Sequence, residues 1–164
     1  MGRGMPSSNE NEQRPQRVYL APRPQPTEAA EFVERFLADL LSDGERFLDS
    51  DAVGRVLSGS RVADAKAAAT RGRKEKRVFA VWDGRTYRYP RFQFDDAGRP
   101  LRETPALIQL LPRQTDGSNR DAALWLYAPD ALLEGKTPAE VFPEDPERVL
   151  RIARRRRGID PTAD

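Results

Sequence analysis

The fold of this chain depends on one short stretch, RVFAVWDGRTYRYP, which runs from Arg77 to Pro90. Two runs rich in aromatic and β-branched residues flank an Asp-Gly pair. This pattern predicts a β-hairpin with a two-residue type I′ turn at Asp83-Gly84. In that register, one largely aromatic side of the hairpin lies on neighbouring helices and carries Val78, Ala80, Trp82, Arg85, Tyr87 and Tyr89. The hairpin is then either the wall of a small core or a wing that steers a basic helix onto DNA.

The residues before the hairpin predict two short helices. Asp49 or Ser50 caps the first helix, and the second runs from Arg61 to about Gly72. The break between them is Ser58-Gly59-Ser60, whose glycine tolerates positive φ and whose last serine suits the next N-cap. Two helices joined by a tight glycine-bearing turn and followed by a twisted hairpin predict a small winged helix-turn-helix domain at residues 46–96.

Positive charge is concentrated in this region. From Arg55 to Arg77 there are eight basic residues and two acidic ones. We therefore predict that the second helix reads DNA, with Arg61, Asp64 and Lys66 at the bases and with Ser60 and Ala67 beside them. The candidates for phosphate contacts are Arg71, Arg73, Lys74, Arg77, Arg85 and Arg88. The alternative is that these cations only solvate an alanine-rich helix.

The rest of the chain predicts an α+β protein that is mostly helical. Residues 1–26 are polar and proline-rich, which predicts a disordered arm. An amphipathic helix is expected at residues 27–45, either packed on its own domain or used for dimerisation. Short amphipathic segments at residues 103–157 predict a compact all-α module, because helices of that length are not stable alone. Residues 158–164 form a tail.

Two residue types are missing from the sequence, and this limits the metal sites and catalytic groups that the protein could contain. The chain has no cysteine and no histidine, which excludes disulfides, thiolate metal sites and imidazole acid–base catalysis. We expect neither an enzyme nor a bound cofactor or metal. The apolar runs are too short for a membrane helix, and the N-terminus lacks a secretory apolar region. These features favour a soluble, cytoplasmic protein with no membrane partner.

Part of the chain, from Leu48 to Arg157, resembles a bacterial family. The stretch ALWLYAPDALLEGKTPAEVFPEDPERVLRIA is similar to the Xre/MbcA/ParS toxin-binding domain, and the region before it resembles a MerR-like winged domain. The matching positions are Trp125, Pro129, Asp130, Leu132 or Leu133, Gly135, Pro138 and Val149. Arg154 and Arg155, in a run of four arginines, are candidates for contact with an acidic partner.

The resemblance implies an antitoxin-like transcriptional regulator. Such proteins pair with RES-type toxins that consume NAD, and they repress their own operon. We expect a homodimer on double-stranded DNA, because one short recognition helix reads too few base pairs for useful specificity. The alternatives are a stand-alone DNA-binding regulator without a toxin and a purely protein-binding module.

Overall fold

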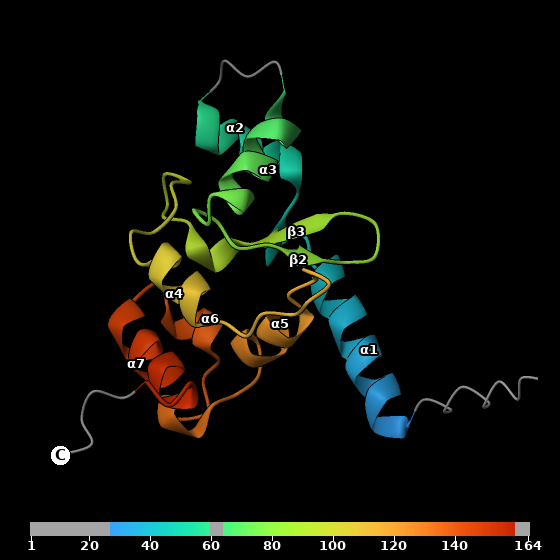
Figure 1. Ribbon diagram of the computed structural model, residues 1–164, viewed down its shortest axis with the longest axis vertical. Coiled ribbons are helices and arrows are strands. Elements are labelled where there is room, and N and C mark those ends of the chain that lie inside the picture. Colours follow the sequence, from blue (N-terminus) through green and yellow to red (C-terminus); the bar gives the residue numbers. More distant parts are fainter. Residues whose placement is uncertain (1–26, 60–63, 160–164) are drawn as a thin grey trace, which may run out of the picture.

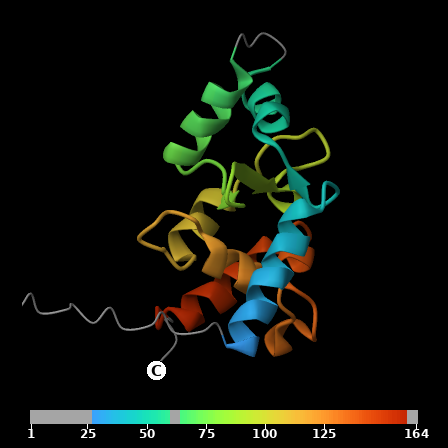
Figure 2. The same cartoon turned by 90° about the vertical axis from the view of Figure 1, so that its right-hand side faces the viewer.

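The chain folds as an α+β structure, described by a computed structural model over residues 27–59 and 64–159. Within these ranges, seven α-helices accompany one three-stranded antiparallel sheet. Figures 1 and 2 show helices α2 and α3 at one end of the molecule and helices α4–α7 at the other, with the sheet between them. The predicted α+β class is confirmed. The predicted arm and residues 160–164 of the predicted tail lie outside the described residues.

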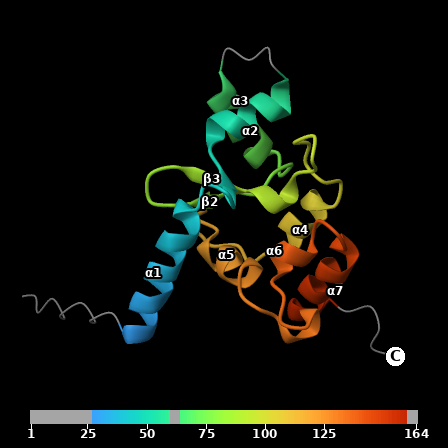
Figure 3. The same ribbon diagram turned by 180° about the vertical axis from the view of Figure 1, so that it is seen from behind.

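The first helix, α1, spans Glu28–Ser42 and confirms the helix predicted near residues 27–45. The Thr27 hydroxyl accepts a hydrogen bond from the Ala30 amide at 3.2 Å, as expected for an N-cap. Only the second half of the apolar stripe is deeply buried: Leu37, Leu40 and Leu41 enter the core, whereas Phe32 is 66% exposed. The first half of α1 therefore projects from the body of the molecule (Figures 1 and 3).

The two helices before the hairpin are α2, Ser50–Ser58, and α3, Ala65–Lys74. Asp49 caps α2 and Gly59 has φ of 67°, both as predicted. The predicted second helix is wrong at its start, because α3 begins four residues later than Arg61. Its N-cap is Asp64, whose carboxylate accepts from the Ala67 amide at 3.0 Å. Residues 60–63 of the connection, where the tight turn was predicted to end, lie outside the described residues.

The sheet consists of β1 (Phe47–Leu48), β2 (Val81–Trp82) and β3 (Tyr87–Pro90) in the order β1-β3-β2. The predicted hairpin exists, but its turn is centred one residue later than predicted, so each strand residue faces a partner two residues further along the chain. Trp82 pairs with Tyr87, and the Asp83 amide donates to the Thr86 carbonyl at 3.0 Å. The Asp83 carboxylate accepts from the amides at positions 85 and 86, so Asp83 caps the turn instead of occupying it. Gly84 takes positive φ and Arg85 does not, which excludes type I′.

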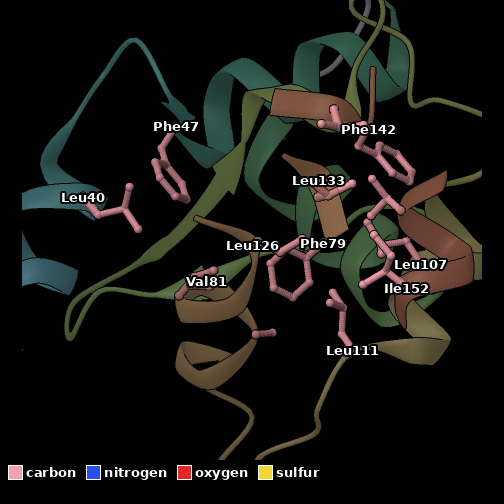
Figure 4. Packing of buried hydrophobic residues seen from close by; sticks show 14 of the residues in the cluster. Leu40, Phe47, Phe79, Val81, Leu107, Leu111, Leu126, Leu133, Phe142 and Ile152 are labelled. Carbon is pink, nitrogen blue, oxygen red and sulfur yellow. The ribbon is translucent and has the colours of Figure 1, made fainter. Parts of the chain in front are cut away.

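Both faces of the hairpin are packed. One face confirms the prediction: Val78, Ala80 and Tyr89 form a small cluster with Val53 of α2 and Ala69 of α3. Residues of the other face, Phe79 and Val81, enter the main core together with Leu126 and Leu133 of the C-terminal half (Figure 4). The hairpin is therefore a wall between two cores, and only its turn extends beyond them.

The outer edge of β2 is also covered. The Trp82 amide donates to the Ser118 carbonyl, and the Asn119 side chain donates to the Ala80 carbonyl, both at 2.9 Å. These bonds join the hairpin to the loop before α5. The main core thus crosses the boundary predicted between residues 96 and 103, whereas the smaller cluster of α2, α3 and the hairpin lies wholly before it.

The C-terminal half is a set of short helices, as predicted. They are η1 (Arg91–Gln93), α4 (Thr104–Leu110), α5 (Arg120–Leu126), η2 (Ala131–Leu133), α6 (Pro138–Val141) and α7 (Pro146–Arg156). Thr137 and Glu140 form a capping box at the start of α6, and Asp145 caps α7. Because carboxylates of this half serve as caps, they are occupied in holding helix ends.

Candidate nucleic-acid interface

Helix α3 buries a narrow face and exposes a basic one. Its buried residues are Ala68, Ala69 and Gly72, and their small size lets the helix lie close to α2. A β-carbon at Gly72 would be 2.6 Å from a Leu57 methyl group. We define the α3 surface as six exposed residues of α3 and of the segment that follows it: Lys66, Ala67, Arg71, Lys74, Lys76 and Arg77. Glu75, which is also exposed, pairs with Arg77.

Three residues of the α3 surface lie along one side of the helix. Ala67, Arg71 and Lys74 are spaced by four and three residues, so their side chains share one side of the helix. The short Ala67 side chain leaves the backbone open to close approach by a large ligand. Some of these cations also stabilise the helix itself, because the dipole of a helix favours positive charge at its C-terminus.

Two predicted phosphate contacts have structural roles instead. Arg73 stacks over the Tyr87 ring, with its guanidinium carbon 3.8 Å from the ring centroid. Its Nε is buried, so α3 is tied to the hairpin at this point. Arg88 is half-buried, and its Nε donates to the Leu41 carbonyl at 3.2 Å. Arg85, by contrast, lies exposed at the hairpin turn.

The ring beneath Arg73 belongs to an aromatic contact that stiffens the hairpin. Trp82 and Tyr87 meet edge to face with ring centroids 5.0 Å apart. Burial raises the pKa of the neighbouring Tyr89 hydroxyl, although Ser50 and Arg73 partly offset this effect. The phenol therefore stays neutral near pH 7, and the net charge of this region comes from its exposed cations.

The residues expected to read bases divide into three groups. Lys66 is exposed, with its Nζ 4.0 Å from an Asp51 carboxylate oxygen on α2. Asp64 is exposed, but one of its carboxylate oxygens already caps α3. Ser60 and Arg61 lie outside the described residues.

The basic surface is not neutralised by the acidic C-terminal half. Within the described ranges, the ion pairs of α3 and its following segment are local, joining Lys66 to Asp51 and Arg77 to Glu75. Three acidic residues of the C-terminal half have partners within that half: Asp130 binds Arg156, Glu134 binds Arg148, and Asp145 caps α7. The α3 surface therefore keeps its positive charge toward solvent.

The residues expected to bind a protein partner are divided between core and surface. Leu133 and Pro138 are buried, and Asp130 is held by Arg156 at 3.1 Å. Pro129, Gly135 and Arg155 are exposed, and Arg154 is half-buried. Gly135 has φ of 83°, which explains why glycine suits the turn there.

Trp125 lines a cavity of about 260 Å³ that sequence reasoning missed. The other lining residues are Leu110, Pro112, Ala153, Arg156 and Arg157. The Arg156 guanidinium lies 5.6 Å from the Trp125 ring centroid, and the Trp125 Nε1 is buried without a hydrogen-bond partner. The lining residues are far apart in the sequence, so no local pattern could have indicated them.

Comparisons with protein-family models, curated proteins and solved structures found no match to this chain. The geometry is therefore the basis for any functional conclusion. In residues 27–59 and 64–159, no three acidic side chains gather as a metal site would require. The helices in those ranges also lack the length and apolar composition needed to cross a bilayer.

Proposed function

We propose that this chain binds double-stranded DNA through the α3 surface, as an antitoxin-like transcriptional regulator acting in the cytoplasm. In this proposal α2, α3 and the hairpin serve as a winged helix-turn-helix unit. The observation that carries it is the exposed, unneutralised row of Arg71 and Lys74 beside Ala67, on a helix at one end of the molecule.

The roles of individual residues follow from their surroundings. Arg71, Lys74 and Arg77 are the phosphate contacts, because each is exposed at the end of α3 or just after it. Arg85 adds a contact at the hairpin turn. Lys66 and Arg61 are the base-reading candidates, whereas Arg73 and Arg88 hold the hairpin in place. Asp64 supports the start of α3 as its cap.

A second candidate function is capture of a protein, such as a RES-type toxin, by the C-terminal half. The cavity beside Trp125 favours it, since an aromatic wall with Arg156 and Arg157 at its rim suits an acidic segment with an apolar anchor. Both arginines also bond within the chain, Arg156 to Asp130 and Arg157 to the Gln109 carbonyl, so an acidic partner would add to these bonds or compete with them. This function and DNA binding use surfaces on different elements. A change at Arg156 should therefore weaken partner capture and leave DNA binding intact.

DNA binding is tested by fluorescence anisotropy with a labelled mixed-sequence duplex at several salt concentrations. Replacing Arg71 and Lys74 by Ala removes two phosphate contacts, so affinity should fall roughly tenfold per contact at about 0.1 M salt. The slope of log K against log salt should become shallower by about two. Circular dichroism should show an unchanged fold, because both side chains are exposed.

The matched control replaces Arg102 and Arg113 by Ala. These arginines are also exposed, and they lie before and after α4, outside the α3 surface. The same charge is lost, so an effect of net charge alone would weaken both double variants equally. Equal weakening would reject the α3 surface as the binding site, and so would an unaffected Arg71/Lys74 variant.

A further inference from the structure

The first half of α1 carries an apolar side chain that the fold does not use. Phe32 is 66% exposed, more than the other large apolar side chains of the described residues; the next are Ile159 at 54% and Leu132 at 48%. Helix α1 is attached to the core by Leu37, Leu40 and Leu41, with Val33 and Phe36 partly buried against the same core, and Phe32 is not among these residues. An aromatic ring left in water on a projecting helix indicates a surface that another molecule covers.

The direction in which Phe32 points is set by Glu34. The Glu34 carboxylate pairs with Arg120 at the start of α5, so this side of α1 faces its own chain. At 3.6 residues per turn, two positions rotate a side chain by about 200°. Phe32 therefore points away from the body of the molecule, together with Ala29 one turn earlier and Arg35 one turn later.

We infer that a second copy of this chain covers Phe32, with the two α1 helices packed antiparallel and crossing at this residue. Such a pair places Arg35 of each copy beside the first turn of the other, which carries Glu28 and Glu31. A parallel pair would instead place like charges side by side. The small Ala29 opposite Arg35 permits the close approach that helix packing requires.

The size of the contact indicates how strong this dimer is. Helix α1 is about 22 Å long, and only its first half is free to pair. That contact is smaller than the roughly 1,200–2,000 Å² buried in stable interfaces. The dimer is therefore weak and concentration-dependent in solution, and a duplex with two binding sites would strengthen it by holding both copies together. The interface itself does not depend on DNA binding.

The first test is analytical ultracentrifugation of the full chain without DNA over a wide concentration range. The mass of the wild type should rise from 18.5 kDa toward twice that value as concentration increases. Phe32→Glu should stay monomeric, because the helix pair would bury two carboxylates. Leu132→Glu, at a similarly exposed apolar position on another element, should dimerise like the wild type.

Two outcomes would overturn the inference. One is a wild type that stays monomeric throughout, as expected if residues 1–26 of the same chain cover Phe32. The other is a Phe32→Glu variant that dimerises like the wild type while its circular dichroism is unchanged. Neither outcome affects the DNA-binding proposal, which is measured with a different surface and a different ligand.

The second test establishes whether the two α1 helices run parallel or antiparallel. The chain has no cysteine, so no native thiol can form a competing disulfide. Under mild oxidation, a mixture of Ala29→Cys and Arg35→Cys proteins should form a disulfide-linked heterodimer more readily than either protein alone. Preferential self-linking of Ala29→Cys would show a parallel pair and reject the antiparallel one.

Discussion

At the scale of single residues, Gln93 shows how one side chain completes the sheet. Phe79 would face Pro90 if the β2–β3 register continued, and proline has no amide hydrogen to donate. The Gln93 amide replaces it: its oxygen accepts from the Phe79 N–H at 2.6 Å, and its nitrogen donates to the Phe79 carbonyl at 2.8 Å. The same nitrogen donates to the Pro90 carbonyl at 2.9 Å.

We predict that Gln93→Leu destabilises the protein by about 2–4 kcal/mol, because it leaves buried backbone groups of Phe79 without partners. Urea unfolding followed by circular dichroism measures this loss. Gln109→Leu is the matched control, since the Gln109 side chain is exposed and should change stability by less than about 0.5 kcal/mol. Equal stability of the two variants would show that the Gln93 bonds contribute nothing.

The contacts of individual arginines explain why the candidate site was only partly predictable from the sequence. Charge counting treats every arginine of the basic region alike. Arg73 is distinguished by Tyr87 on β3, and Arg88 by the Leu41 carbonyl on α1. Those partners come close only after folding, so a linear pattern carries no signal for them. Arg71 and Lys74 face solvent, and their contact with DNA stays a prediction.

At the scale of elements, the local sequence identified four helix caps correctly. The caps at Thr27, Asp49, Thr137 and Asp145 each act on an amide three residues away, so their chemistry is complete within one turn. The hairpin turn was predicted wrongly because Asp-Gly fits two registers. The one observed lets the Asp83 carboxylate satisfy two amides of the turn.

The packing of α2 on α3 gives a prediction for Gly54. A β-carbon at this position would lie 1.7 Å from the Ala65 carbonyl oxygen, a backbone atom at the start of α3. Gly54→Ala should therefore force the helices apart and destabilise the protein by about 1–3 kcal/mol, outweighing the gain of about 1 kcal/mol in helix propensity.

Thermal unfolding of Gly54→Ala and Gly44→Ala makes the comparison. Gly44 has open space around it and no positive φ, so alanine there should be neutral or stabilise by up to about 1 kcal/mol. If Gly54→Ala were as stable as Gly44→Ala, the close contact between α2 and α3 would be refuted.

At the scale of the whole molecule, the main core joins segments that the sequence pattern separates. Phe47, Phe79 and Val81 of the predicted winged domain pack with residues of α4–α7. The main core therefore crosses the boundary predicted between residues 96 and 103. Core continuity depends on which face of the hairpin meets which helices, and no local pattern contains that information.

A continuous core predicts a single cooperative unfolding transition. The two tryptophans report on different halves, with Trp82 in the hairpin and Trp125 in α5. Urea unfolding followed by fluorescence in Trp125→Phe and in Trp82→Phe, each compared with circular dichroism of the same variant, should give coincident transitions. A hairpin signal that separates from the circular dichroism curve would indicate two independently folding parts.

The central claim is that DNA lies on the α3 surface, and nuclear magnetic resonance maps this contact directly. A mixed-sequence duplex titrated into the ¹⁵N-labelled chain should shift the amides around Arg71, Lys74 and Arg77 most strongly, with smaller shifts at the Gly84-Arg85 turn. Shifts concentrated instead on the basic end of α7, at Arg154–Arg157, with α3 unchanged, would contradict the account.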